Sequence, residues 1–357
     1  MAKVSFNNQQ SVFFNTINTR VEQYFESTKL KRTGNRKLYI KTFILIGSAV
    51  AIYSSLLLVS MPPALAIFLC CLFGIVQAGI GFNVMHDANH GSYSSRRWVN
   101  DIMSHTANML GVNSLFWKQK HNVIHHTYTN VDGVDDDIIK NPMFRMCPTQ
   151  KHMWIHKFQY LYCVPLYGLT SIVWVFVSDF AKYFQGKIQT TKMPPMVPKE
   201  HAIFWLTKVL YIFFYVVLPI YIVGFVPFII GFAIAHFTLG IALSLVFQLA
   251  HVVESTHFED AKIDTPLHIQ DEWAIHQVRS TADFATKNKI ISWFTGGLNF
   301  QIEHHLYPRV SHVHYPVIHN IVKEVCEDHS VRFNNYPSMG SALMSHFRFL
   351  KQLGSAN

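Results

Sequence analysis

Seven histidines of this chain fall into three short groups, and each group lies beside a long apolar segment. The first two groups, HDANH and HNVIHH, place histidines four positions apart, and the third, QIEHH, has a glutamine and two histidines at i, i+3 and i+4. On a helix such positions share one face. Neutral imidazole is a good ligand for iron, copper, zinc and nickel, so each group could supply metal ligands. The histidines are His86, His90, His121, His125, His126, His304 and His305.

We predict that the three groups share one metal site. Ionisable residues near membrane spans are costly and usually functional, and chance would rarely place three such clusters at helical spacing. So many nitrogen ligands exceed the capacity of one ion, which indicates two metals. A carboxylate-bridged ferritin-like site needs two Glu-x-x-His motifs, whereas the chain has only Glu254–His257, and the HExxH motif of zinc hydrolases is absent.

Three further residues are candidates for the same site. His251 closes the last apolar segment at the depth of His86, so it is either an eighth ligand or a buried histidine bonded to Glu254. Gln301 opens the third group and Gln248 precedes His251 by three positions; each could bind metal or support a neighbouring ligand. Nine isolated histidines are expected to be ordinary hydrogen-bonded side chains, namely His152, His156, His201, His236, His268, His312, His314, His319 and His346.

Two polar segments accompany the groups. The acidic run Asp132–Asp137 lacks the spacing of an EF-hand, and we expect a solvated or helix-capping loop, with support of the imidazole N–H groups as the alternative. A second segment precedes the third group, and its side chains either line the substrate and steady the ligands or simply pack. These residues are Trp273, His276, Gln277, Thr281 and Asp283.

The composition indicates a polytopic membrane protein. Half of the 357 residues are hydrophobic and only 14% are charged, against about 25% in soluble proteins. Several apolar runs are long enough to cross a bilayer as helices. The net charge of +9 fits cytoplasmic loops that face anionic lipid, and no compact basic motif of a nucleic-acid-binding domain is present. We therefore expect the lipid bilayer, and no nucleic acid, as a partner.

We predict an all-α fold with four transmembrane helices in two hairpins and a cytoplasmic helical cap that holds the histidines, as one domain over residues 1–357. The Lys- and Arg-rich tail, 1–37, indicates a cytoplasmic amino terminus. If the three groups share one site, residues 158–181 cannot cross and should lie at the membrane interface, where Trp and Tyr are common. The expected spans are 38–60, 64–84, 202–223 and 226–250, with 85–201 and 251–357 cytoplasmic.

The order HDANH, HNVIHH and QIEHH resembles the membrane-bound fatty acid desaturases. The segments GGLNFQIEHHLYP and WAIHQVRSTADF are similar to the front-end group, which inserts a double bond between an existing one and the carboxyl end. The glutamine of the third group is typical of that group, although some sphingolipid desaturases share it. The resemblance covers the chain from about residue 38 onward.

This resemblance implies a non-haem di-iron centre at the cytoplasmic face, which uses O2 to place a cis double bond in a linoleoyl-type acyl chain. It also implies that His251 binds iron, because related enzymes have a ligand at the end of the fourth span. Many eukaryotic front-end members carry a fused cytochrome b5 domain with an HPGG motif, which is absent here. The implied ligands are His86, His90, His121, His125, His126, His251, His304 and His305.

Two expectations follow from the resemblance, and two alternatives to it remain open. The electrons are expected from an external donor, either ferredoxin or cytochrome b5 with its reductase. The membrane is expected to be the bacterial inner membrane, or the endoplasmic reticulum in a eukaryote, with the site facing the cytoplasm. A sphingolipid desaturase or lipid hydroxylase with the same metals is the alternative among enzymes. A membrane metal-binding protein without enzymatic activity is the alternative outside them.

Overall fold

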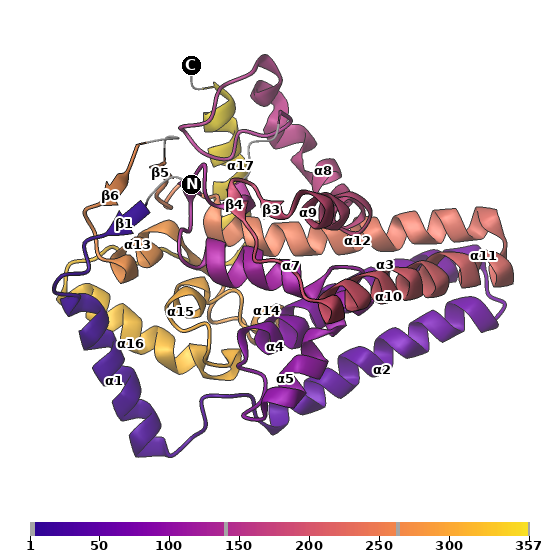
Figure 1. Ribbon diagram of the computed structural model, residues 1–357, viewed down its shortest axis with the longest axis horizontal. Helices are drawn as coiled ribbons and strands as arrows, with labels where there is room; N and C mark the ends of the chain where they lie inside the picture. The colour runs from indigo at the N-terminus through magenta and orange to yellow at the C-terminus, as the bar shows by residue number, and fades with distance from the viewer. Residues whose placement is uncertain (1–3, 139–141, 262–264, 356–357) are drawn as a thin grey trace.

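The computed structural model describes residues 4–138, 142–261 and 265–355. The structure is mostly helical, with long helices that extend from a body of shorter elements (Figure 1). Five helical stretches are long and apolar enough to cross a membrane, so the expected count of four is not confirmed. They are Arg36–Leu58, Pro63–His90, Trp154–Gln185, Pro198–Val223 and Phe225–His251. The additional stretch is the one expected to lie at the interface.

The first hairpin leads directly into the first histidine group. Helix α2 (Arg36–Leu58) begins where the side chain of Asn35 accepts a hydrogen bond from the Lys37 amide. Helix α3 (Pro63–Ile80) starts with a proline, which suits the first helical turn. It continues without interruption through the π-helical turn η1 (Gly81–Met85) into α4 (His86–His90). Gly91, at φ 74°, ends this helix in the left-handed conformation that glycine adopts readily.

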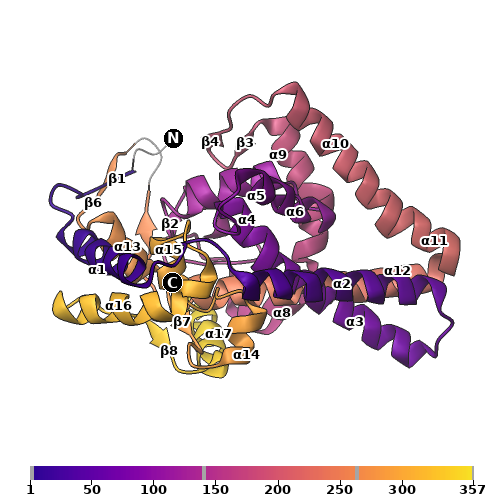
Figure 2. The ribbon, with the colours of Figure 1, turned by 90° about the horizontal axis from the view of Figure 1, so that it is seen from below.

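The second hairpin likewise leads directly to a histidine, His251, at the end of its second helix. Its first arm comprises α10 (Pro198–Ile212), η6 (Phe213–Val217) and α11 (Leu218–Val223). Gly224 makes the turn, and α12 (Phe225–His251) returns as one helix that ends at the histidine. The tips of both hairpins lie together, away from the shorter elements (Figure 2). The two hairpins therefore bring the ends of α4 and α12 to the same end of the bundle.

Helix α8 (Gln159–Val173) crosses α12 at close range, and it continues through η5 (Trp174–Ser178) into α9 (Asp179–Gln185). A Cβ atom on Gly240 of α12 would lie 2.6 Å from the carbonyl oxygens of Tyr167 and Gly168. Both ends of the α8–α9 stretch contact the histidine end of the molecule. Gln159 donates to the Leu350 carbonyl at 2.8 Å, and Asp179 accepts from the Asn113 amide at 2.7 Å.

The remaining elements form a cap over the histidine end. Helices α1 (Val12–Thr28), α13 (Trp273–Ser280), α15 (Gln301–Leu306) and α16 (Tyr315–Asp328) share one apolar core, with Ile17, Ile302 and Ile318 fully buried. The other helices of the described residues are α5 (Arg97–Ser104), α6 (Thr106–Met109), α7 (Ser114–Lys118), η2 (Gln119–His125), η3 (Asp136–Ile138), η4 (Trp154–Phe158), α14 (Lys289–Phe294), η7 (His312–His314) and α17 (Met339–Ser355).

The described residues contain four short strand pairs, and three of them join distant parts of the cap. Three pairs are parallel and link segments far apart in the chain, which ties the amino terminus and the acidic loop to the carboxy-terminal region. The parallel pairs are β1 (Val4–Phe6) with β6 (Leu267–Ile269), β2 (Val131–Asp132) with β5 (Glu259–Asp260), and β7 (Asp283–Phe284) with β8 (Asn335–Tyr336). The fourth pair is the antiparallel hairpin of β3 (Lys187–Ile188) and β4 (Thr191–Lys192).

The α8–α12 crossing predicts a strong response to a single methyl group. We expect Gly240→Ala to lower the free energy of unfolding by about 1–3 kcal/mol, because the new Cβ atom would press against two carbonyl oxygens. Gly47→Ala in α2 is the matched control, since a Cβ atom there meets nothing within 4 Å. Thermal unfolding in detergent measures both variants. Equal melting temperatures for the two would contradict the close crossing.

Candidate metal centre

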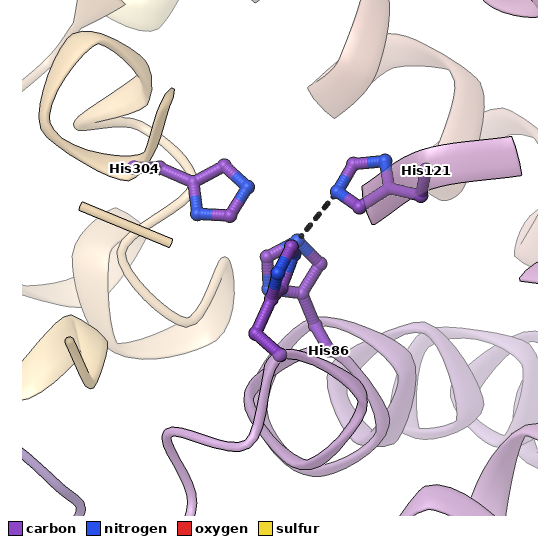
Figure 3. Close-up of side chains that lie close together, drawn as sticks. His86, His121 and His304 are labelled. Carbon is purple, nitrogen blue, oxygen red and sulfur yellow. Dashed lines mark hydrogen bonds between the residues drawn. The ribbon is translucent and has the colours of Figure 1, made fainter. Parts of the chain in front are cut away.

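Four histidines from three separate segments converge in a first group. His86 and His90 come from α4, His121 from η2 and His304 from α15. One ring nitrogen from each lies within 4.8 Å of the others, and all four residues are buried. The rings of His86, His121 and His304 face a common centre (Figure 3), where the Nε2 atoms of His86 and His121 are 3.2 Å apart.

Three more histidines form a second group beside the first. His125, His251 and His305 bring one ring nitrogen each within 4.8 Å of the others. The ring of His126 lies between the groups, with its centroid 4.6 Å from that of His304 and 4.4 Å from that of His305. The structure thus brings together all eight histidines singled out in the sequence.

Several ring nitrogens at this centre are buried without a hydrogen-bond partner among the described residues. A buried polar atom in that state costs about 1–3 kcal/mol, and native proteins rarely leave one unsatisfied. Such atoms on residues of both histidine groups fit metal coordination, which would satisfy each nitrogen that faces a metal through its lone pair. They are His90 Nε2, His125 Nε2, His126 Nδ1, His251 Nδ1 and His304 Nε2.

Burial keeps most of these imidazoles neutral. In the cap, the pKa values of His121, His126, His304 and His305 are lowered well below the usual range, because burial disfavours the charged form and neighbouring imidazoles repel a second charge. A metal ligand must offer a lone pair, and so it must be unprotonated. The electrostatics of the centre therefore suit metal binding.

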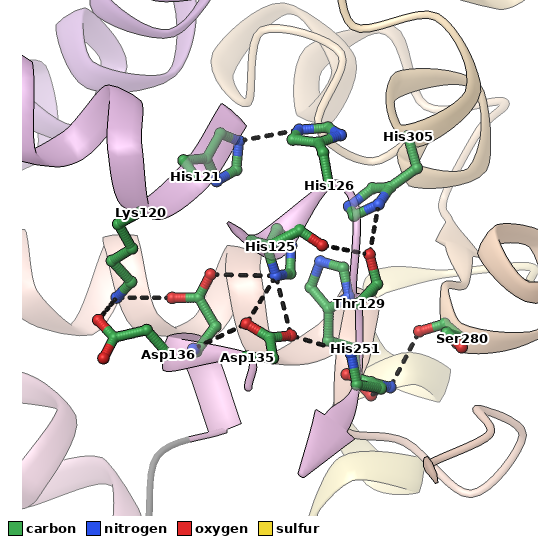
Figure 4. Close-up of polar contacts among 12 residues, drawn as sticks. Lys120, His121, His125, His126, Thr129, Asp135, Asp136, His251, Ser280 and His305 are labelled. Atoms are coloured by element: carbon green, nitrogen blue, oxygen red, sulfur yellow. Dashed lines mark hydrogen bonds and ion pairs between the residues drawn. The ribbon is translucent and has the colours of Figure 1, made fainter. Parts of the chain in front are cut away.

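Polar side chains behind the imidazoles hold three of them by the nitrogen that faces away from the centre. His125 Nδ1 lies 3.0 Å from Asp135 Oδ2, His304 Nδ1 3.1 Å from the Tyr315 hydroxyl, and His305 Nδ1 2.8 Å from Gln277 Oε1. Thr129 also contacts His305 Nδ1, at 3.1 Å (Figure 4). Such contacts orient the rings and leave the opposite nitrogen free for a metal.

The acidic run is buried, so the expectation of a solvated loop is wrong. Asp135 is only 1% exposed, and it supports His125 while also accepting the Asp137 amide at the start of η3. Asp137 forms an ion pair with Lys120 at 2.7 Å. Burial lowers the pKa of His125, but Asp135 and Asp137 outweigh it and raise the net value. The helix-capping role and the alternative of support for an imidazole are confirmed, whereas the solvated loop was expected because charge density alone does not reveal a buried partner.

The structure excludes one alternative for His251, and its role as a ligand stays a prediction. Its Nε2 atom lies 3.0 Å from the amide nitrogen of Gln301, and that amide lies 3.3 Å from His305 Nε2. Glu254 faces Gln352 instead, so the alternative of a His251–Glu254 bond is wrong. The Gln301 amide can turn its oxygen toward the same point. The buried Oε1 atom of Gln248 has no hydrogen-bond partner among the described residues, so no hydrogen bond of this atom within them links it to the histidines.

Two other polar links surround the centre, and of their residues only Asp283 was among the candidate supports. Asp87, inside the first histidine group, accepts from Ser311 at 2.7 Å and contacts His312 at 3.0 Å, which ties α4 to the loop after α15. Asp283 contacts His319 at 2.8 Å and accepts the Ile302 amide at 3.0 Å. Each of the nine isolated histidines has a hydrogen-bond partner, as expected.

An apolar crevice reaches the first group from the side of the long helices. It is a small cavity of about 20 Å³, lined by His86, Trp117 and apolar side chains of η1, η5 and α12 that include Leu239, Leu243 and Phe247. Nearly all of its exposed lining is apolar, so the four-histidine group has an apolar side that faces the long helices. A hydrocarbon chain would enter only if these side chains moved apart, because the space is about that of a single water molecule.

Comparisons with known proteins agree on one family. Residues 62–337 match the model of the family described as fatty acid desaturase. The chain is 36% identical to an sn-1 linoleoyl-lipid 6-desaturase of Synechocystis sp. over 98% of this chain and 97% of that protein. It is 35% identical to a protein of the same name from Arthrospira platensis, over 96% and 92%. An acyl-lipid (8-3)-desaturase of Physcomitrium patens is 36% identical over 96% of this chain and 72% of its own.

The contact of Tyr315 with His304 generates a prediction about metal affinity. We expect Tyr315→Phe to weaken metal binding about 10-fold or more, because the ring of His304 loses the partner that orients it. Tyr307→Phe is the matched control, since that hydroxyl donates to Asn18 rather than to a histidine. Competition with a chelator measures the affinity of each purified variant. Equal affinities would show that the Tyr315 hydroxyl has no role at the centre.

Proposed function

The chain belongs to the fatty acid desaturase family, and on that premise we propose that it places a cis double bond in a linoleoyl-type chain at the front-end position. It is an oxidoreductase that acts on acyl lipids. Two of the relatives are named sn-1 linoleoyl-lipid 6-desaturases, which supports a substrate that is a membrane lipid with an existing double bond. The bond would form between that existing one and the carboxyl end.

The observation that carries this proposal is the pair of histidine groups at one end of the bundle. His86, His90, His121 and His304 would hold one iron, and His125, His251 and His305 the other, with His126 between them. Gln301 would bind or support the second iron through its amide. Gln248 would support the ligands only if its buried Oε1 atom, which has no partner among the described residues, forms a contact when iron binds.

Two bound irons would supply the electron transfer and O2 chemistry by which two hydrogens leave neighbouring methylene carbons. The residues of this chain do the positioning. An acyl chain that parts the side chains of the apolar crevice would lie beside His86, where Trp117, Leu243 and Phe247 keep water away. Asp135, Gln277 and Tyr315 hold the imidazoles in the orientation that coordination requires. Electrons would come from a separate protein, ferredoxin or cytochrome b5 with its reductase.

We propose four crossings, with the centre at the cytoplasmic face and residues 1–37 on the same side. The stretch Trp154–Gln185 is long and apolar enough to cross, but both of its ends contact the histidine end of the molecule. A helix that crossed would have its ends on opposite sides of the bilayer. The contacts of Gln159 with Leu350 and of Asp179 with Asn113 thus favour a stretch that lies along the histidine end of the molecule, at the membrane interface, rather than across the bilayer.

This topology predicts which sites a membrane-impermeant thiol reagent can label. In a variant without the five native cysteines, we expect Lys192→Cys and Lys323→Cys to react from the cytoplasmic side, and Ser60→Cys from the opposite side. Lys192 follows the stretch Trp154–Gln185, Lys323 lies in the cap, and Ser60 lies in the turn of the first hairpin. Labelling of Lys192→Cys from the same side as Ser60→Cys would establish a fifth crossing.

The function itself predicts a product that depends on the histidine centre. A host fed linoleate and expressing this chain should accumulate an acid with a new double bond on the carboxyl side of the existing one. His304→Ala should reduce that product about 100-fold or more, because it removes a buried ligand from the first group. His268→Ala, at a histidine bonded to Ser5, should leave it unchanged. Mass spectrometry of the total fatty acids locates the bond, and a hydroxylated product would instead establish a lipid hydroxylase.

A further inference from the structure

A second, polar pocket opens on the other side of the four-histidine group. It has a volume of about 800 Å³ and is formed by α4, α5, α7 and the segment after α15. His90 and His126 lie in its wall, so it reaches the centre directly. The apolar crevice touches the same group through His86. The four-histidine group therefore lies between a polar pocket and an apolar crevice.

Three cationic side chains line this pocket. Within residues 4–138, 142–261 and 265–355, none of the three forms an ion pair. They are Arg97 on α5, Lys118 at the end of α7 and Arg309 after α15, and Asp101 is the single carboxylate of the lining. Asn122 adds a buried carbonyl oxygen that has no partner in the described part of the chain. The pocket thus offers positive charge for an anion and an acceptor for a hydroxyl group.

The position of α5 places the mouth of the pocket at the level of lipid head groups. Val99 and Met103 of α5 pack against the cluster of Leu38 and Leu45, at the first turns of the span α2. On another face of α5, Trp98 is 59% exposed and Ile102 55% exposed. Tryptophan is enriched where membrane and water meet, and apolar side chains on one face of a short cap helix suit insertion into the interface.

We propose that this pocket binds the phosphate head group of a membrane glycerophospholipid whose acyl chain extends along the four-histidine group. This inference rests on the proposed function. A front-end reaction attacks a carbon only a few methylenes from the ester, so the head group must lie close to the histidines. The pocket meets that requirement through His90 and His126. Arg97, Lys118 and Arg309 would pair with the phosphate, and Asn122 would accept from a head-group hydroxyl.

The exposed apolar face of α5 favours a lipid over other phosphate-bearing substrates. A coenzyme A thioester would arrive from solution, and it would gain nothing from Trp98 and Ile102. A lipid would enter the pocket from the bilayer, beside α5, and its phosphate would already lie at the same depth in the membrane as Arg97. The three faces of α5 therefore have three roles: one packs on α2, one faces the bilayer and one lines the pocket.

Lipid binding to the full-length, metal-loaded protein tests this inference. The probes are phosphatidylglycerol, which has a phosphate and hydroxyls, and an uncharged galactosyl diacylglycerol with the same acyl chains, each in nanodiscs and measured by native mass spectrometry. We expect the triple variant Arg97→Gln, Lys118→Gln, Arg309→Gln to bind phosphatidylglycerol about 10-fold more weakly or worse. Its affinity for the galactolipid should change less than about 2-fold.

The matched control removes the same three charges from exposed positions outside the pocket, through Arg96→Gln, Lys192→Gln and Lys199→Gln. It should bind both lipids like the unchanged protein. Equal affinity of the two triple variants for phosphatidylglycerol would overturn the inference, as would competition by an acyl-coenzyme A that depends on the three cations. Product formed by the unchanged protein in the same nanodiscs would show that the proposed function stands even if the head-group site does not.

Discussion

The structure depends on the burial of eight imidazoles at one point. Their rings are close enough that a charge on one would repel its neighbours, and burial adds to the cost of that charge. Neutral imidazoles carry lone pairs, and several of those lone pairs have no partner among the described residues. Metal ions would suit this arrangement, because they bind the free lone pairs and place positive charge where protonation is unfavourable. The polar shell behind the rings and the helices that carry them all serve this arrangement.

The long helices supply the centre as well as an anchor in the membrane. The first hairpin continues without a break into His86 and His90, and α12 ends at His251. Since these ligands stand on the ends of long helices, little conformational freedom is lost when metal binds. The apolar crevice beside the same helices gives the first group an apolar side. One set of long helices therefore fixes ligand positions and also covers the centre with apolar side chains on that side.

The helical spans and the eight histidines could be predicted from the sequence, because hydropathy and i, i+4 spacing are local signals. The partners behind the ligands could be predicted only in part. The acidic run that contains Asp135 and the segment that contains Gln277 were candidate supports, each as one of two alternatives, whereas no local signal pointed to Tyr315. All three meet their imidazoles only through the folded cap, so no spacing in the chain links them. The stretch Trp154–Gln185 remained ambiguous for a related reason: its composition allows a crossing, and only its end contacts argue against one.

Metal content is the most direct measure of the central claim, that this centre holds two irons. Purified protein would be analysed for iron, zinc and copper by mass spectrometry with inductively coupled plasma, against a separate determination of chain concentration. The account predicts two irons per chain and no haem absorbance, since two groups of buried histidines stand side by side. Zinc in place of iron, haem absorbance, or one metal per chain in fully loaded protein would contradict it.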